Sequence, residues 1–266
     1  MLTKSFIFLD KIDRISERNL WKQGITAWDK FIAAHAIKGI SLARKSFYDR
    51  QLRKAQTALY NFDASYFIGK LPAAETWRMY HFFKEDAVFL DIEVTGVGRN
   101  DDVTVIGLFD GVNTKVMIKG VNLDLNALRE ELEKYKLIVS YNGSTFDVPF
   151  LMKRYPELMP KIPHFDLKTA CQRLGLKGGL KEVERKLHIQ RQNAIVDRLY
   201  KGDIIKLYKI YRATGDEYYL KLLVEYNEED VINLKFIADK VVEMLSQHTF
   251  TEHYEKQLLH AEYSPE

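Results

Sequence analysis

The strongest constraint on the fold lies in the middle of the chain, where three β-branched apolar runs follow one another between residues 87 and 118. Turn-forming stretches rich in glycine, asparagine and aspartate separate the runs, and this spacing predicts a three-stranded meander. Further along, a short apolar run at residues 136–142 alternates with segments of helical periodicity. The predicted helices cover residues 124–135, 146–154, 179–187, 203–211 and 226–245. Such alternation of strands and helices predicts an α/β domain.

The first 80 residues have a different character, with short helical patterns at residues 12–23, 28–36 and 46–60. Thr26 is placed to cap the second of these helices. The change in pattern predicts three parts. These are a helical accessory unit at residues 1–80, the α/β domain at residues 81–246, and a polar tail at residues 247–266.

Composition narrows the class of protein without naming a partner. The chain has 266 residues, 46% of them hydrophobic, and a formal net charge of +3. This balance is far from the strongly basic one of a protein that coats nucleic acid nonspecifically. The single cysteine, Cys171, excludes an intramolecular disulfide and favours a reducing, cytoplasmic setting. The longest apolar runs are too short for a bilayer and the N-terminus lacks a signal-peptide pattern, so we expect no membrane association.

Asp91 and Glu93 lie two residues apart in the first apolar run. Residues at this spacing project from the same face of a strand, so both carboxylates point the same way. Two adjacent acids repel each other, and a divalent cation between them removes the repulsion because magnesium and manganese prefer oxygen ligands. An exposed strand face with two solvated acids is the alternative interpretation.

Two further acids occur at positions where a ligand of such a cation would be placed. Asp147 follows the run at residues 136–142 at a strand-to-helix junction, the edge where ligands bind in open α/β sheets. The alternative is that its charge only complements the N-terminal end of the next helix. Tyr226 and Asp230 share one face of a predicted helix, four residues apart. Glu228 and Glu229 between them are interpreted as solvated.

Taken in order, these pieces resemble the DEDD superfamily of 3′-to-5′ exonucleases in its tyrosine-bearing branch. The strings D-I-E-x-T-G, Y-N-G-x-x-F-D and Y-N-x-x-D-V-x-N-L begin at Asp91, Tyr141 and Tyr226. They are similar to those of a prokaryotic family described as ribonuclease H-like domain or predicted exonuclease proteins. The likeness covers roughly residues 80–245. It implies a ribonuclease H-like fold, a mixed five-stranded sheet flanked by helices.

The resemblance also implies roles for individual residues. Asp91, Glu93, Asp147 and Asp230 would hold two Mg²⁺ or Mn²⁺ ions, the arrangement that activates water and stabilises charge in phosphodiester hydrolysis. Tyr226 would orient the attacking water, since a phenol that ionises near pH 10 is a poor general base at neutral pH. Thr95, Asn142 and Phe146 stand where the family grips the terminal nucleotide, with turn formation or core packing as the alternative.

The expected activity is 3′-to-5′ hydrolysis of nucleic acid, with single-stranded DNA 3′ ends as the partner. Ribonuclease H proper lacks a second ligand two residues after the first-strand aspartate, so Glu93 favours an exonuclease over an endonuclease. RNA trimming by the same site stays open, because nothing in the sequence reads a 2′-hydroxyl. A nucleic-acid-binding protein with an idle nuclease fold also stays open, and protein partners cannot be named.

Three secondary features complete the sequence hypothesis. Lys177 and Lys181 flank a glycine pair and could follow a phosphate backbone, although interleaved glutamates also suit a solvated helix. Asp166 is interpreted as a helix cap, and His164 as a residue that binds no metal. The string at residues 9–28 resembles a helix-hairpin-helix element, but Lys11 and Asp13 replace its glycines. Because aspartate repels phosphate, we interpret this unit as degenerate.

Overall fold

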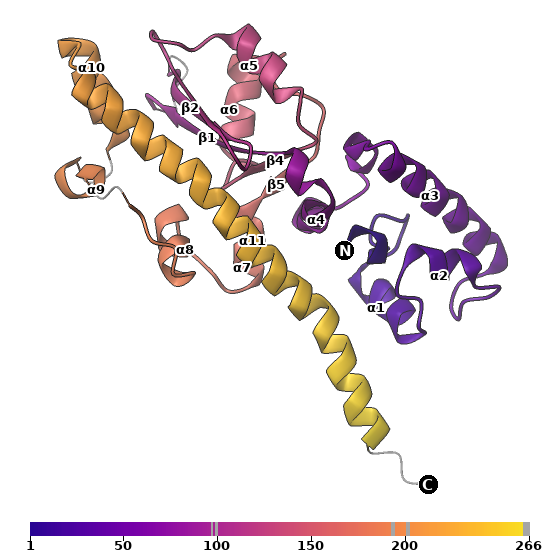
Figure 1. Ribbon diagram of the computed structural model, residues 1–266. Helices are drawn as coiled ribbons and strands as arrows, with labels where there is room; N and C mark the ends of the chain where they lie inside the picture. The colour runs from indigo at the N-terminus through magenta and orange to yellow at the C-terminus, as the bar shows by residue number, and fades with distance from the viewer. Residues whose placement is uncertain (97, 99–100, 193–194, 201–202, 263–266) are drawn as a thin grey trace.

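The computed structural model describes residues 1–96, 98, 101–192, 195–200 and 203–262. Its strands are β1 (Ala87–Val94), β2 (Val103–Phe109), β3 (Thr114–Ile118), β4 (Leu137–Ser140) and β5 (His164–Asp166). They form one sheet in the order β3-β2-β1-β4-β5 (Figure 1). β1 is antiparallel to β2 and parallel to β4, so the sheet is mixed. The predicted α/β fold with a mixed five-stranded sheet is confirmed.

The sheet is covered by helices on both faces, as Figure 1 shows. The helices after the meander are α5 (Leu125–Leu132), α6 (Asp147–Arg154), α7 (Leu167–Arg173), α8 (Leu180–Lys186), α9 (Ile195–Tyr200), α10 (Ile204–Thr214) and α11 (Glu217–Glu262). Val88, Leu90 and Ile92 of β1 share a core cluster with residues of α5 and α6. Ala87 and Phe89 share another with residues of α11. Odd-numbered residues of β1 therefore face α11, and even-numbered residues face the opposite side.

Side-chain caps define where several helices begin. Asp124 accepts hydrogen bonds from the backbone N–H groups of Asn126 and Ala127 at the start of α5, and Asp203 caps α10 in the same way. Gly215 ends α10 in the left-handed conformation, with φ of 70°. The start of α5, the α6 and α8 helices and the start of α10 agree with the predicted segments within a few residues.

The last helix differs most from the prediction. α11 begins at Glu217 and continues through Glu262, so it extends past residues 226–245 in both directions and through most of the predicted polar tail. No glycine or proline interrupts residues 217–262, which explains why the helix continues where hydrophobic periodicity fades. None of the described helices is both long and apolar enough to cross a membrane.

The N-terminal part consists of short helices joined by turns. These are η1 (Leu2–Lys4), α1 (Arg14–Lys22), α2 (Trp28–Ala33), α3 (Leu42–Tyr60), η2 (Ala64–Phe67), η3 (Ala73–Met79), α4 (Tyr80–Phe83) and η4 (Lys84–Asp86), where η denotes a 3-10 helix. The predicted cap of α2 is wrong, because Ala27 occupies the capping position without a side-chain hydrogen bond. Asp13 caps α1 through Ser16, and Lys11 adopts a positive φ of 59°. Asp13 thus stabilises the helix at a position where the resembled motif has glycine.

A buried ionic cluster lies between the N-terminal helices and the α/β part of the chain. The Arg78 guanidinium contacts Glu17 of α1 at 2.9 Å and Glu75 of η3 at 2.6 Å, and all three side chains are about 1% exposed. Glu75 also pairs with Arg173 of α7 at 2.9 Å. Apolar residues from both parts belong to one core cluster. The N-terminal helices are therefore packed onto the sheet and α11 as part of one core.

Candidate metal centre

β1 places the two central acids on the face of the sheet that α11 covers. Asp91 and Glu93 are half-buried, while their neighbours Leu90, Ile92 and Val94 are buried on the other face. The register pairs Asp91 with Gly107 of β2 and Glu93 with Val105. The i, i+2 spacing therefore brings the two carboxylates to one face, as the sequence predicts.

α11 brings a third carboxylate to the pair. One oxygen each of Asp91, Glu93 and Asp230 lies within 4.8 Å of the others, and Asp230 is buried. α11 approaches β2 closely at this point because Gly107 of β2 has no side chain. A Cβ at this position would lie 2.0 Å from Oδ1 of Asn227, one turn before Asp230. Asn227 in turn donates from Nδ2 to Oδ2 of Asp91 at 3.1 Å, which fixes the orientation of that carboxylate.

Asp147 lies beside this group without being part of it. It is the first residue of α6, is 5% exposed, and accepts a hydrogen bond from the backbone N–H of Ile92 at 3.2 Å. The pairing of β1 with β4 ends at Phe89, so this N–H points toward a gap at the edge of β4 that Asp147 fills. Gly143 permits the approach, since a Cβ there would lie 2.0 Å from Ser140 Oγ and 3.4 Å from Asp147 Oδ2.

The four carboxylates resist ionisation in the arrangement described. Burial raises the pKa of Asp91 well above its usual range, and the three neighbouring carboxylates raise it further. Burial, followed by the charges of Asp230 and Asp147, raises the pKa of Glu93 to about 8. Burial likewise raises the pKa values of Asp147 and Asp230 to about 6. A cluster of this kind needs a compensating positive charge to remain ionised at neutral pH.

The donor set fits a hard divalent cation. Asp91, Glu93 and Asp230 offer only carboxylate oxygens, the ligands that Mg²⁺ and Mn²⁺ prefer, and Asp147 offers a further one nearby. A cation between them would relieve the repulsion that raises their pKa values. The residues present therefore fit a metal-binding site. Because Asp230 is far from Asp91 and Glu93 in sequence, these carboxylates come together only in the folded chain.

One positive charge already reaches this group from the loop after α8. Arg191 pairs with Oδ1 of Asp230 through Nη2, and its Nε and Nη2 donate to the two oxygens of Glu184 at 2.7 and 2.8 Å. The side chain is 11% exposed. The sequence analysis did not identify Arg191 or Glu184 as site residues, because no strand or helix periodicity relates them to Asp91, Glu93 or Asp230.

Tyr226 lies one turn before Asp230 in α11, as predicted, and is 5% exposed. Two cations face its ring: Lys181 Nζ lies 4.8 Å from the ring centroid, and the Arg191 guanidinium carbon lies 5.5 Å from it. The ring also belongs to a core cluster with Val105 of β2. The Tyr226 ring therefore lies between the carboxylate group and α8. Of the two lysines predicted to bind substrate, Lys181 is the one that contacts this ring.

The other predicted substrate residues mostly serve the local turns. Thr95 is exposed, and its hydroxyl donates to Asp101 at 2.8 Å. Asn142 has a positive φ of 67°, and its side-chain oxygen accepts from Thr145 in the turn before α6 and from Lys168 of α7. Phe146 packs against the core cluster under α6, and Lys177 is exposed. These contacts agree with the turn and packing alternatives, and a substrate role for Thr95, Asn142 and Phe146 stays a prediction.

The two secondary hypotheses about β5 can be compared with the same turn. Asp166 caps α7 through the N–H of Lys168, as predicted, and also accepts hydrogen bonds from the N–H groups of Asn142 and Ser144. His164 Nε2 lies 2.7 Å from Ser140 Oγ. Asp166 therefore holds the turn that positions Asp147.

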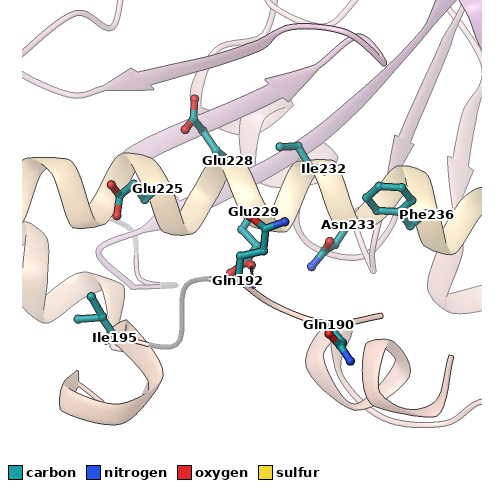
Figure 2. Close-up of a pocket in the computed structure, with 9 residues that line it drawn as sticks. All are labelled: Gln190, Gln192, Ile195, Glu225, Glu228, Glu229, Ile232, Asn233 and Phe236. Atoms are coloured by element: carbon teal, nitrogen blue, oxygen red, sulfur yellow. Dashed lines mark hydrogen bonds between the residues drawn. The ribbon is translucent and has the colours of Figure 1, made fainter. Parts of the chain in front are cut away.

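A hollow of about 550 Å³ borders the other side of the Arg191 loop. Glu225, Glu228 and Glu229 of α11 line it, and Figure 2 shows Gln192 in front of Glu229. The interpretation of Glu228 and Glu229 as solvated is wrong. Glu229 is 11% exposed and accepts from the Gln192 N–H, while Glu228 accepts from Thr114 Oγ1 at 2.6 Å. Both carboxylates hold neighbouring segments against α11.

The chain was compared with family models, curated proteins and solved structures, and the family match agrees with the α/β fold. A family model described as RNase_H superfamily matches residues 88–242. No curated protein sequence matches the chain. The family B DNA polymerase from the hyperthermophilic archaeon Pyrobaculum calidifontis is similar with 19% identity and a TM-score of 0.48, over 60% of this chain and 25% of the polymerase. A structure described as the apo form of the nuclease has 17% identity and a TM-score of 0.44, over 72% of this chain and 92% of its own. The chain thus spans about a quarter of the length of the polymerase.

Proposed function

This chain belongs to the ribonuclease H superfamily, and from that premise we propose that it is a metal-dependent 3′-to-5′ exonuclease of the DEDD group, tyrosine branch. The observation that carries the proposal is the carboxylate group of Asp91, Glu93 and Asp230, with Asp147 beside it. The proposed substrate is the 3′ end of single-stranded DNA. The proposed cofactor is a pair of Mg²⁺ or Mn²⁺ ions.

Each residue of the proposed site has a separate task. Asp91 and Glu93 supply ligands from a rigid strand, and Asn227 keeps Asp91 in a fixed orientation. Asp230 supplies a ligand from α11, and Asp147 supplies one from the start of α6. When bound, divalent ions would lower the pKa of a coordinated water and stabilise charge on the leaving oxygen. Tyr226 would orient the attacking water, and Lys181 would attract the phosphate strand toward the site.

The proposed organisation of the chain follows from the position of these residues. Every member of the proposed site lies within residues 81–246, the proposed exonuclease domain. Residues 1–80 form the proposed accessory unit, which shares a core with that domain. Residues 247–266 form the proposed C-terminal segment, which is helical through Glu262.

The proposed activity is tested with a 5′-labelled single-stranded oligonucleotide in the presence of Mn²⁺. We expect a ladder of products shortened one nucleotide at a time from the 3′ end, and loss of the ladder on addition of a chelator. Parallel DNA and RNA substrates of the same sequence decide which sugar is preferred, with DNA expected to be cleaved faster. Internal cuts without a ladder would instead identify an endonuclease. Absence of both cleavage and Mn²⁺ binding would identify an idle nuclease fold.

Tyr226→Phe separates a water-orienting role from a packing role. Phenylalanine keeps the buried ring and its contacts with Lys181 and Arg191 but removes the hydroxyl. We expect the cleavage rate to fall by about a hundredfold while Mn²⁺ affinity and thermal stability stay unchanged. Tyr219→Phe, on the same helix and against the same core cluster, is the matched control and should retain the wild-type rate. Equal rates in the two variants would leave Tyr226 as a packing residue.

A further inference from the structure

Arg191 occupies the place beside Asp230 where a cation is required. Nη2 contacts the Asp230 carboxylate, and Nη1 lies 3.8 Å from Oε2 of Glu229. Asp230 is also one of the three acids whose oxygens lie within 4.8 Å of one another. A divalent cation held by this group would therefore share Asp230 with a guanidinium, and two cations so close repel each other.

Glu184 holds Arg191 independently of Asp230. Its two oxygens accept from Nε and Nη2 in a bidentate arrangement, and Oε1 also accepts from Asn233 Nδ2 at 2.9 Å. Glu184 itself is 1% exposed. Because this anchor does not involve the metal ligands, the guanidinium can release Asp230 and stay beside the site.

A released guanidinium would still have donors to offer. Within the described residues, Nη1 of Arg191 is buried and donates no hydrogen bond. The same side chain lines a cavity of about 660 Å³ together with Lys181, Arg185 and His188. Among the described residues of that lining Glu184 is the only acid, and its oxygens are already bound by Arg191 and Asn233. The cavity is therefore suited to an anion, and planar guanidinium groups match phosphate oxygens in particular.

Resting on the proposed function, we propose that Arg191 exchanges Asp230 for a phosphate of the nucleic acid strand. Without metal, Arg191 neutralises Asp230. With metal on the carboxylates, it turns its donors to the phosphate that lies at the site while Glu184 keeps hold of it. Arg191 is thus a positioning residue that competes with the metal in the absence of nucleotide and cooperates with it in the presence of nucleotide.

The test measures binding by calorimetry, with Mn²⁺ alone and then with thymidine 5′-monophosphate at saturating Mn²⁺. Arg191→Gln should bind Mn²⁺ about tenfold more tightly than the wild type, because a charge beside the metal has been removed. The same variant should bind the nucleotide about tenfold more weakly, because a charge-assisted hydrogen bond is lost. Thymidine, which has no phosphate, should bind both proteins equally. These opposite changes distinguish the exchange from a merely structural role, which would weaken both.

Arg185→Gln is the matched control, since Arg185 lines the same cavity and, within the described part of the chain, forms no ion pair with Asp230. Its Mn²⁺ affinity should stay within about twofold of the wild type. Arg191→Lys is the second variant if Arg191→Gln fails to fold. A single ammonium cannot bind Glu184 in a bidentate arrangement and also contact Asp230. In Arg191→Lys, tighter Mn²⁺ binding and weaker nucleotide binding should therefore both appear, but to a smaller extent.

The outcomes separate this inference from the function on which it rests. Wild-type protein that binds no Mn²⁺ would overturn the proposed function and this inference together. Wild-type protein that binds Mn²⁺ and nucleotide, with unchanged Mn²⁺ affinity in the folded Arg191 variants, would overturn the exchange alone. Equal tightening in Arg185→Gln would also overturn it, since the effect would then be one of general charge.

Discussion

Asp91→Asn is expected to abolish nuclease activity and at the same time raise the thermal stability of the metal-free protein. Asp91 is the acid that the other three carboxylates surround, and all of them raise its pKa. Asparagine has the same shape and can still accept the hydrogen bond from Asn227. It replaces a carboxyl whose ionisation the fold opposes with a neutral amide, so the metal-free fold should gain stability while the metal loses a ligand.

The two effects are measured on the same variant. We expect the rate of oligonucleotide cleavage to fall by at least about a thousandfold, and the melting temperature in chelator to rise by several degrees, roughly the equivalent of 1 kcal/mol. Added Mn²⁺ should raise the melting temperature of the wild type and have little effect on the variant, because ligand binding stabilises only a protein that binds it.

Asp10→Asn is the matched control for this experiment. Asp10 is an exposed residue of the N-terminal unit, and the substitution makes the same chemical change outside the carboxylate group. Its activity and its response to Mn²⁺ should be those of the wild type. If Asp91→Asn retained activity, the carboxylate group would not be the catalytic centre. If it lowered the melting temperature in chelator, the four acids would not be in repulsion.

Much of the site could be predicted from local patterns. Asp91 and Glu93 were recognisable because strand periodicity alone puts i and i+2 on one face, and Tyr226 and Asp230 because helix periodicity does the same for i and i+4. Gly107 offered a signal as well, since a glycine inside an apolar strand often marks a close approach of another segment. That segment proved to be α11 at Asn227.

The contacts of Arg191 could not be predicted in this way. It lies in a loop without periodicity, and its partner Asp230 is 39 residues away in sequence. Only the packing of α8 against α11 brings Glu184 and Asn233 together to hold the guanidinium. The N-terminal ionic cluster could not be predicted for the same reason, since Arg78 and Glu17 are 61 residues apart in sequence. Neither pair has a local signature, because each forms only when distant elements pack.

Arg78→Met should be the most destabilising single substitution among those considered for this protein. The guanidinium lies within 3.0 Å of both oxygens of Glu17, of Oε2 of Glu75 and of Ser5 Oγ, and it is about 1% exposed. Removing it leaves two buried carboxylates without their main counterion. We expect the free energy of unfolding to fall by about 3–5 kcal/mol, the usual cost of breaking a buried ion pair on one side.

The matched control is Arg14→Met, which removes a different arginine from the same cluster. Arg14 contacts Glu75 at 2.6 Å, but its side chain is 48% exposed, so water replaces much of the interaction. Its loss should cost no more than about 1 kcal/mol. The pair is compared by urea denaturation at pH 7. Similar losses in both variants would show that Arg78 is not the central counterion of the cluster.

The pH dependence of the free energy of unfolding, compared between the wild type and Arg78→Met, gives an independent test of the role of Arg78. Burial raises the pKa of Glu75, but Arg78 and Arg173 outweigh burial, so its pKa lies below the ordinary 4.5. A lowered folded-state pKa means that Glu75 stabilises the wild type above pH 4.5 and that this contribution is lost as the pH falls further. In Arg78→Met, the orphaned carboxylates gain from protonation. The deficit of the variant should therefore be largest near pH 7 and shrink as the pH falls toward 4, and a deficit that grew on acidification would contradict the assignment of Arg78 as the counterion of Glu75.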